Sequence, residues 1–169
     1  MIVLGIDQAA VSGWCIARRT ATGTAEVIAH GVVTKAAERR DVIARALLAC
    51  DVASGERMAA VYEAHTVGGG DRWHPATMIG MGDARGRWLE ALELAGVPRR
   101  LCIGVTPYTW RSAMIGRHRM KRHEMKAAAV LSCRGRGVTV ASDDEAEAVL
   151  IAMWGALWCA EIAKIAGKR

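Results

Sequence analysis

The sequence predicts an α/β fold in which a mixed five-stranded sheet is flanked by helices. Short apolar segments typical of strands fill the first part of the chain and recur before later helical segments. Segments with apolar residues at helical spacing separate them. The chain has 169 residues, 52% of them hydrophobic, which is enough for one sizeable core, and no Pro/Ser-rich linker divides it. We therefore expect residues 1–169 to form a single domain.

The first half of the chain is predicted to form three strands, a helix and a fourth strand. Apolar or alternating residues separated by short turns predict an antiparallel meander of Ile2–Asp7, Gly13–Arg19 and Ala25–Val33. A helix is expected at Ala36–Cys50. Its apolar face comprises Val42, Ile43, Ala46 and Leu47. The apolar run Met58–Glu63 predicts the fourth strand, after the turn residues Ser-Gly.

The middle of the chain is predicted to contain a loop, a helix and the fifth strand. His65–Pro75 holds three consecutive glycines, which favours a loop. Thr77–Leu94 has a helical pattern and is followed by Gly96 and Pro98, which are typical stop signals. Leu101–Val105 is apolar and predicts the fifth strand.

The last part of the chain is predicted to be helical. Tyr108–Lys126 is expected to form a short helix, a loop and the start of a helix that runs to Cys133. Ser142 and Glu145 have the spacing of a capping box and predict a final helix that ends near Ile165. The resulting order, βββ-α-β-α-β-α-α, is that of the ribonuclease H fold.

Four acidic residues are placed where this fold would bring them together. Asp7 and Glu63 end the first and fourth strands, which are neighbours in such a sheet. Asp144 and Glu147 lie at the start of the final helix, three residues apart and so on one face, with Cβ atoms about 5–6 Å apart. Mg²⁺ prefers hard oxygen ligands, and two divalent ions about 4 Å apart can catalyse phosphodiester hydrolysis. These carboxylates therefore predict a Mg²⁺ site, in which Mn²⁺ is expected to substitute.

The charge of the chain favours a polyanionic partner. Lys and Arg number 23 against 17 Asp and Glu, so the formal net charge is +6. Six basic residues that suit phosphate contacts crowd one segment: Arg111, Arg117, Arg119, Lys121, Arg122 and Lys126. Lys121 and Lys126 are also alternative candidates for stabilising charge at a scissile phosphate. An acidic cluster in a basic chain indicates a metal that acts on nucleic acid.

The remaining composition argues against export and membrane insertion. The five cysteines are scattered and lack the paired short spacing of a zinc or redox site, so we expect reduced thiols. No basic leader precedes the first strand, and the longest apolar stretch, Ala148–Ala160, is too short to span a bilayer. We expect a cytoplasmic protein that has no membrane partner.

Five short motifs occur in one order over nearly the whole chain. They are Ile2-Val3-Leu4-Gly5-Ile6-Asp7 with Ser12-Gly13-Trp14, Tyr62-Glu63, Gly80-Met81-Gly82-Asp83-Ala84-Arg85-Gly86, Pro107-Tyr108-Thr109-Trp110-Arg111, and Asp144-Glu145-Ala146-Glu147-Ala148. Together they resemble the RuvC-type Holliday-junction resolvases, in the broad form of that family that includes phage proteins. The motifs resemble, in turn, its opening strand with the catalytic aspartate, its second acidic site, its dimer helix, the start of its DNA-binding region and its final Asp-x-x-Asp-Ala.

The resemblance implies a function and a set of partners. It implies a metal-dependent endonuclease that cuts branched DNA, chiefly four-way junctions, as a homodimer. The implied metal ligands and catalytic residues are Asp7, Glu63, Asp144 and Glu147. The helix Thr77–Leu94 would join the two subunits through residues that include Met78, Gly82, Arg85 and Leu89. A two-fold dimer suits a junction because a junction has two equivalent scissile strands.

The chain also departs from the pattern of that family. Glu147 stands where the family usually has Asp, and Asp143, which is i,i+4 with Glu147, is an alternative ligand. The chain contains no Phe, whereas bacterial members place an aromatic wedge after the second acid. Trp73 is the only large aromatic in that loop, so it is expected to take this role in DNA binding or, alternatively, to anchor the loop. A non-catalytic protein that binds structured DNA is the alternative function. An actin-like ATPase is disfavoured because it needs two domains and a second Gly-rich hairpin.

Overall fold

The structure is a computed structural model and describes every residue except 10, 52–54, 65–74, 117–119 and 159–169. Five strands form one sheet: β1 (Ile2–Asp7), β2 (Ser12–Arg19), β3 (Ala25–Val33), β4 (Met58–Glu63) and β5 (Cys102–Val105). The helices are α1 (Ala36–Leu48), α2 (Pro75–Leu94), a 3₁₀ turn (Arg99–Leu101), α3 (Pro107–Met114), α4 (Arg122–Gly135) and α5 (Asp143–Leu157). The predicted mixed five-stranded sheet with flanking helices is confirmed.

The sheet has the strand order β3-β2-β1-β4-β5. β1 pairs antiparallel with β2 and parallel with β4, and β4 pairs parallel with β5. β1 is central, and its apolar residues from Ile2 to Ile6 are almost completely buried because helices cover both of its faces. The carboxyl ends of β1 and β4 therefore lie side by side at one edge of the sheet.

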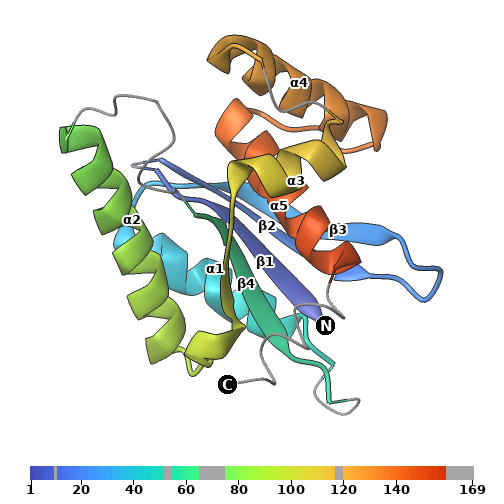
Figure 1. The fold of residues 1–169 in the computed structure, drawn as a ribbon. Coiled ribbons are helices and arrows are strands. Elements are labelled where there is room, and N and C mark those ends of the chain that lie inside the picture. Colours follow the sequence, from blue (N-terminus) through green and yellow to red (C-terminus); the bar gives the residue numbers. More distant parts are fainter. Residues whose placement is uncertain (10, 52–54, 65–74, 117–119, 159–169) are drawn as a thin grey trace.

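The helices divide between the two faces of the sheet (Figure 1). α5 crosses β1 and β2 on one face, where α3 and α4 lie beside it, while α1 and α2 cover the other. α5 lies very close to the strands because they contain glycine where it crosses. A Cβ added at Gly5 would be 2.6 Å from the carbonyl oxygen of Ala148, and one at Gly13 would be 2.5 Å from the carbonyl carbon of Asp144. This close packing fixes the start of α5 against the carboxyl end of β1.

The start of α5 differs in one detail from the predicted capping box. Ser142 Oγ accepts a hydrogen bond from the backbone N–H of Glu145 at 3.2 Å, as expected. The Glu145 carboxylate does not complete the box; it accepts from the N–H of Ala141 at 2.5 Å and lies 2.7 Å from Nδ1 of His30 on β3. The carboxylate therefore links α5 to the sheet as well as capping the helix.

The other element boundaries agree with the prediction within a few residues, except that α5 is described only to Leu157, and the predicted end near Ile165 lies outside the described residues. The chain after β5 contains three helices; the short first one, α3, was expected for its segment but is missing from the predicted order of elements. Leu47, predicted on the apolar face of α1, is 36% exposed, whereas Val42, Ile43 and Ala46 are buried. Among the described residues, no helix is both long enough and apolar enough to cross a membrane. The four described cysteines are free, and Cys159 lies outside the described residues.

Candidate active site

Two of the four predicted carboxylates lie at the ends of neighbouring parallel strands. Asp7 is the last residue of β1 and Glu63 is the last residue of β4. The register pairs Ile6 with Tyr62, so the next residue of each strand, Asp7 or Glu63, lies at the same level of the sheet. The Glu63 residue is only 4% exposed. The strand ends therefore bring together the two acids that the sequence predicts to be neighbours.

The first turns of α5 bring the other two carboxylates, Asp144 and Glu147, to the same edge. Glu147 is 7% exposed. The pKa of Asp7 is raised well above its usual value, first by burial and then by the negative charges of Glu147, Glu63 and Asp144. The side chains of all three other acids thus lie within electrostatic reach of Asp7.

Arg111, on α3, bridges two of these carboxylates. Its guanidinium donates to Oε2 of Glu63 at 3.3 Å and to Oε1 of Glu147 at 3.2 Å. The indole Nε1–H of the buried Trp110 donates to the same Glu63 oxygen at 2.9 Å. Burial raises the pKa of Glu147 to about 7, although the positive charge of Arg111 opposes the shift. Arg111, predicted among the DNA contacts, is therefore directed at the acidic cluster.

Lys126, on α4, pairs with the two aspartates that begin α5. Its Nζ contacts Asp143 and lies 3.3 Å from Oδ1 of Asp144. Burial would lower the pKa of Lys126, but the hydrogen bonds and charges of the two aspartates outweigh it, so the pKa is raised. Asp144 is among the charges that raise the pKa of Asp7, whereas Asp143 is not. Of the two aspartates, Asp144 is the one whose charge acts on Asp7.

The donor chemistry of the cluster suits a hard divalent cation. Carboxylate oxygens are the ligands that Mg²⁺ prefers, and the raised pKa of Asp7 reflects a concentration of negative charge that a cation would relieve. No three acidic, His or Cys side chains of the described residues already converge to metal-binding distances. Arg111 and Lys126 instead hold carboxylate oxygens of the cluster in ion pairs. The residues fit a metal by charge and ligand type, and an ion would compete with these two side chains.

The predicted DNA-binding segment is described only in part. Lys121 immediately precedes α4 and Arg122 is its first residue, and both side chains are exposed. They lie about one turn before Lys126, which reaches the acidic cluster. The remaining members of the prediction lie outside the described residues: Trp73, Arg117 and Arg119. Exposed positive charge therefore adjoins the acidic cluster at the N-terminus of α4.

α2 presents some of the predicted dimer residues to solvent. Gly82 and Arg85 are exposed, and nothing lies within 4 Å of a Cβ added at Gly82. Leu89, which was predicted at the dimer contact, is instead 6% exposed and packs in the hydrophobic core, because it faces the protein interior rather than solvent. The side chain of Met78 lies outside the described residues.

Two residues beside the cluster were not anticipated from the sequence. Trp110 holds Glu63 through its indole, and the side-chain amide of Gln8 donates to the backbone carbonyl of Glu63. Gln8 is 2% exposed, and its Oε1 has no hydrogen-bond partner among the described residues. Their positions next to Arg111 and Asp7 in the sequence were the available signal. Gln8 directly follows Asp7, the acid that ends β1, and its contact with Glu63 makes it a candidate support for the end of β4.

Comparison with known proteins identifies the fold. No protein-family model and no curated protein sequence matches the chain. Among solved structures, the chain is similar to RuvC of Thermus thermophilus in complex with a Holliday junction substrate, with a TM-score of 0.67, 21% identity and 94% of each chain covered. A second Thermus thermophilus RuvC structure gives a TM-score of 0.62 and 23% identity, over 95% of this chain and 96% of that one. The chain therefore has the ribonuclease H-like fold of the RuvC structures.

Proposed function

We propose that the chain is a metal-dependent endonuclease that cuts branched DNA, chiefly four-way junctions. The observation that carries this proposal is the meeting of four carboxylates from β1, β4 and α5 at one edge of the sheet. Exposed basic residues at the start of α4 lie beside them. The fold is shared with a RuvC that was solved with a Holliday junction substrate, which supports the choice of DNA substrate.

Asp7, Glu63, Asp144 and Glu147 would hold Mg²⁺ or Mn²⁺. Two such ions supply a nucleophile at neutral pH and stabilise the charge that develops during phosphodiester hydrolysis. The chain's own contribution is to hold the carboxylates in place. Gln8 and Trp110 fix Glu63, and the close contact of Gly13 with α5 fixes Asp144.

Lys126 is the lysine that we assign to the scissile phosphate. Of the two candidates from the sequence, it alone contacts the aspartates of the cluster, whereas Lys121 is exposed at the start of α4. A cation beside the carboxylates lowers the electrostatic cost of bringing a phosphate close to them. Lys121 and Arg122 instead suit contacts to the backbone further along the DNA.

The proposed enzyme is a two-fold homodimer joined through α2. Gly80, Gly82 and Gly86 leave open space on the exposed side of this helix, which permits close approach of a second backbone. Ile79 is 73% exposed on the same helix and can supply apolar contact. Leu89 is buried in its own core and takes no part in this contact.

Replacement of Asp7 tests the catalytic proposal. We expect Asp7→Asn to lower the single-turnover cleavage rate of a synthetic four-way junction in Mg²⁺ by more than about 100-fold, since loss even of a group supporting a metal ligand costs about 10–100-fold. Junction binding should be retained or strengthened because one negative charge is removed. Asp41→Asn, at an exposed position of α1, is the matched control and should cleave as the wild type does.

The same assay separates the alternatives. Asp144→Asn should be more damaging than Asp143→Asn, and the reverse order would show that Asp143 is the ligand. Cleavage by Asp7→Asn within a few-fold of the wild type would contradict the proposed site. Tight binding of junctions by the wild type without Mg²⁺-dependent cleavage would favour the non-catalytic DNA-binding protein instead.

A further inference from the structure

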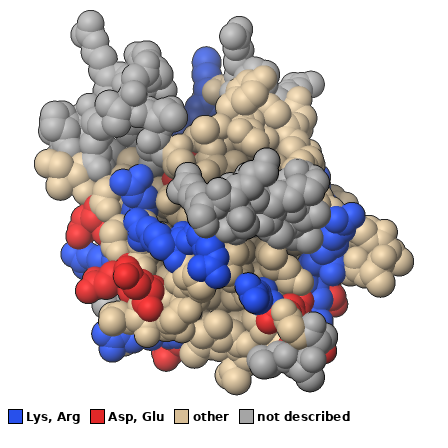
Figure 2. Space-filling model, turned by 60° about the horizontal axis from the view of Figure 1, so that its bottom comes forward, with Lys and Arg blue, Asp and Glu red and all other residues tan. Residues whose placement is uncertain are grey.

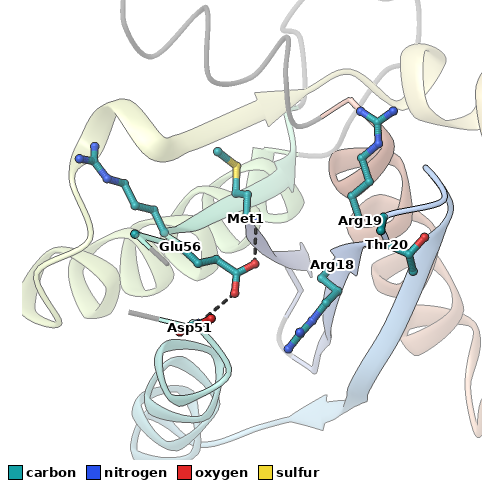
Figure 3. Close-up of a pocket in the computed structure, with 9 residues that line it drawn as sticks. Met1, Arg18, Arg19, Thr20, Asp51 and Glu56 are labelled. Carbon is teal, nitrogen blue, oxygen red and sulfur yellow. Dashed lines mark hydrogen bonds and ion pairs between the residues drawn. The ribbon is translucent and has the colours of Figure 1, made fainter. Parts of the chain in front are cut away.

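A second feature lies at the opposite end of the sheet from the carboxylates. A pocket of about 560 Å³ is formed there by the end of β2, the start of β1 and the residues that precede β4 (Figure 3). Arg18 and Arg19 line it from β2, and Arg57 lines it from the segment before β4. Met1 is its largest apolar lining residue. The pocket is therefore a polar site with little apolar surface.

Two acids, Asp51 and Glu56, line this pocket, and the carboxylate of Glu56 is already engaged. The carboxylate of Glu56 lies 2.8 Å from the N-terminal ammonium of Met1 and accepts from the backbone N–H of Asp51 at 2.9 Å (Figure 3). Burial would raise the pKa of Glu56, but these two interactions outweigh it and the pKa is lowered. Glu56 is thus held as an anion chiefly by the Asp51 backbone and the N-terminus, with a smaller contribution from the charge of Arg18.

The arginines keep donors available. Arg18 uses one guanidinium nitrogen to donate to the carbonyl of Ala49 at 3.3 Å, while its buried Nε has no partner among the described residues. Arg19 and Arg57 are exposed and form no ion pair with a described residue. Three arginines therefore line one open pocket, and the side chains of Arg18 and Arg19 point away from each other at its margin (Figure 3).

The positive charge extends beyond the pocket. β5 runs parallel to β1 and β4, so the exposed Arg99 and Arg100, which precede β5, lie at the same end of the sheet. Figure 2 turns the bottom of the molecule forward and shows Lys and Arg side chains across it, with groups of Asp and Glu side chains beside them. We call this surface the arginine edge; its members are Arg18, Arg19, Arg57, Arg99 and Arg100.

We propose that the arginine edge is a second contact surface for the nucleic-acid backbone, which holds a DNA arm away from the site of cleavage. This inference rests on the proposed function. All five residues are arginines, whose planar forks match phosphate oxygens in a bidentate geometry that lysine cannot provide. β1 is roughly 20 Å long, a length that about six base pairs of duplex span. One arm can therefore reach both ends of the sheet.

The composition of this surface favours nucleic acid over an acidic protein as its partner. Protein partners are anchored by a central apolar or aromatic cluster surrounded by a polar rim. The pocket offers Met1 alone as a large apolar side chain, and the remaining lining is short, polar or charged. A phosphate backbone needs no apolar anchor, because salt-dependent ion pairing supplies most of its affinity.

The test compares two double variants in binding and cleavage. Arg19→Ala with Arg57→Ala removes two exposed members of the arginine edge, and Arg40→Ala with Arg134→Ala removes two exposed arginines elsewhere, on α1 and α4. Binding of a labelled four-way junction is measured in EDTA by fluorescence anisotropy at several salt concentrations. We expect the first variant to bind at least about tenfold more weakly at 0.1 M salt and to lose about 0.9 of salt slope per phosphate contact. The control should retain both values.

Cleavage at saturating protein distinguishes this proposal from the proposed function. The Arg19/Arg57 variant should cleave in Mg²⁺ at the wild-type single-turnover rate once the junction is bound, and its thermal melting should match the wild type. If the wild type cleaves junctions but the variant binds them with unchanged affinity and salt slope, the arginine edge does not contact DNA and an acidic protein is the remaining partner. If the wild type neither binds nor cleaves branched DNA, the proposed function fails and this inference fails with it.

Discussion

α5 and α2 are both rich in small residues, yet the structure uses them in opposite ways. On α5, Ala148 and Ala152 are fully buried and lie against the backbone of β1 at Gly5. On α2, Gly82 and Gly86 have nothing within 4 Å of an added Cβ. One helix uses small side chains to approach its own sheet, and the other leaves that space open at the surface.

The charges around the small residues distinguish the two helices. α5 carries acids only in its first two turns, and the rest of the helix is apolar and buried. α2 carries charged residues along its length, including the Asp83–Arg87 ion pair, in which both side chains are 56% exposed. A run of small residues therefore indicates internal packing only where the neighbouring positions are apolar as well.

Adding one methyl group to each region should change stability in opposite directions. Gly5→Ala would place a Cβ 2.6 Å from the Ala148 carbonyl oxygen, so we expect the free energy of unfolding to fall by about 1–3 kcal/mol or more. Gly82→Ala adds a better helix former in space that is open in the single subunit, and should raise the free energy of unfolding of that subunit by up to about 1 kcal/mol. Urea unfolding of both variants and the wild type measures the two changes.

Equal changes in the free energy of unfolding for Gly5→Ala and Gly82→Ala would contradict the comparison of α5 with α2. If Gly5→Ala is as stable as the wild type, α5 does not lie against β1 as the structure shows. The start of α5, with Asp144 and Glu147, would then have no fixed position relative to Asp7.

The buried charge of α5 should also make stability depend on pH in the absence of metal. The pKa of Glu147 is raised from 4.5 to about 7, so the folded state keeps a proton that the unfolded state loses as pH rises through this window. This group therefore lowers the free energy of unfolding as pH rises from about 4.5 to 7, by roughly 3 kcal/mol at most. The raised pKa of Asp7 acts in the same direction.

The measurement is urea unfolding in EDTA at pH 4.5 and pH 7.5. Asp143, whose pKa is lowered, works in the opposite direction, so the contribution of Glu147 is taken as the difference between the wild type and Glu147→Gln. We expect the free energy of unfolding of Glu147→Gln minus that of the wild type to be larger at pH 7.5 than at pH 4.5. Asp41→Asn, at an exposed position of α1, should leave the pH dependence unchanged.

The smallest change in the stability of the subunit is expected for Gly82→Leu, a substitution that should break the proposed dimer contact. Gly82→Leu fills open space in a single subunit and should raise its stability by about 0.5–1 kcal/mol. In a dimer joined through α2 the same side chain would overpack the contact, so the variant should be monomeric and lose paired incision of both strands. Light scattering of wild type and variant at micromolar concentration measures this. A wild type that is monomeric both free and bound to a junction would rule out the dimer.

The sequence predicted the elements that depend on local pattern and the acids that end them. The strands of the sheet and the positions of Asp7 and Glu63 follow from apolar runs that stop at a charged residue. The start of α5 followed from Ser142, whose side chain caps the helix. These features depend on neighbours in the chain, which a sequence displays directly.

The contacts that complete the site depend on packing between distant elements. Arg111 was predicted to contact DNA because it belongs to a basic segment, but α3 packs against α5 and directs it to Glu63 and Glu147. Leu89 was placed at an interface because it lies on the same helix as the exposed glycines, but it faces the core. Which side of a helix faces inward is set by the sheet that it covers.

The position of α5 also governs when the protein can act. Asp7 and Glu63 come from the first half of the chain, while Asp144 and Glu147 are carried by the last of the described elements. Chains emerge from the ribosome N-terminus first, at about 5–20 residues per second, so β1 and β4 are synthesised seconds before α5. Under the proposed function, a partly made chain therefore has only two of the four carboxylates and cannot assemble the site that cuts DNA until α5 has docked on the sheet.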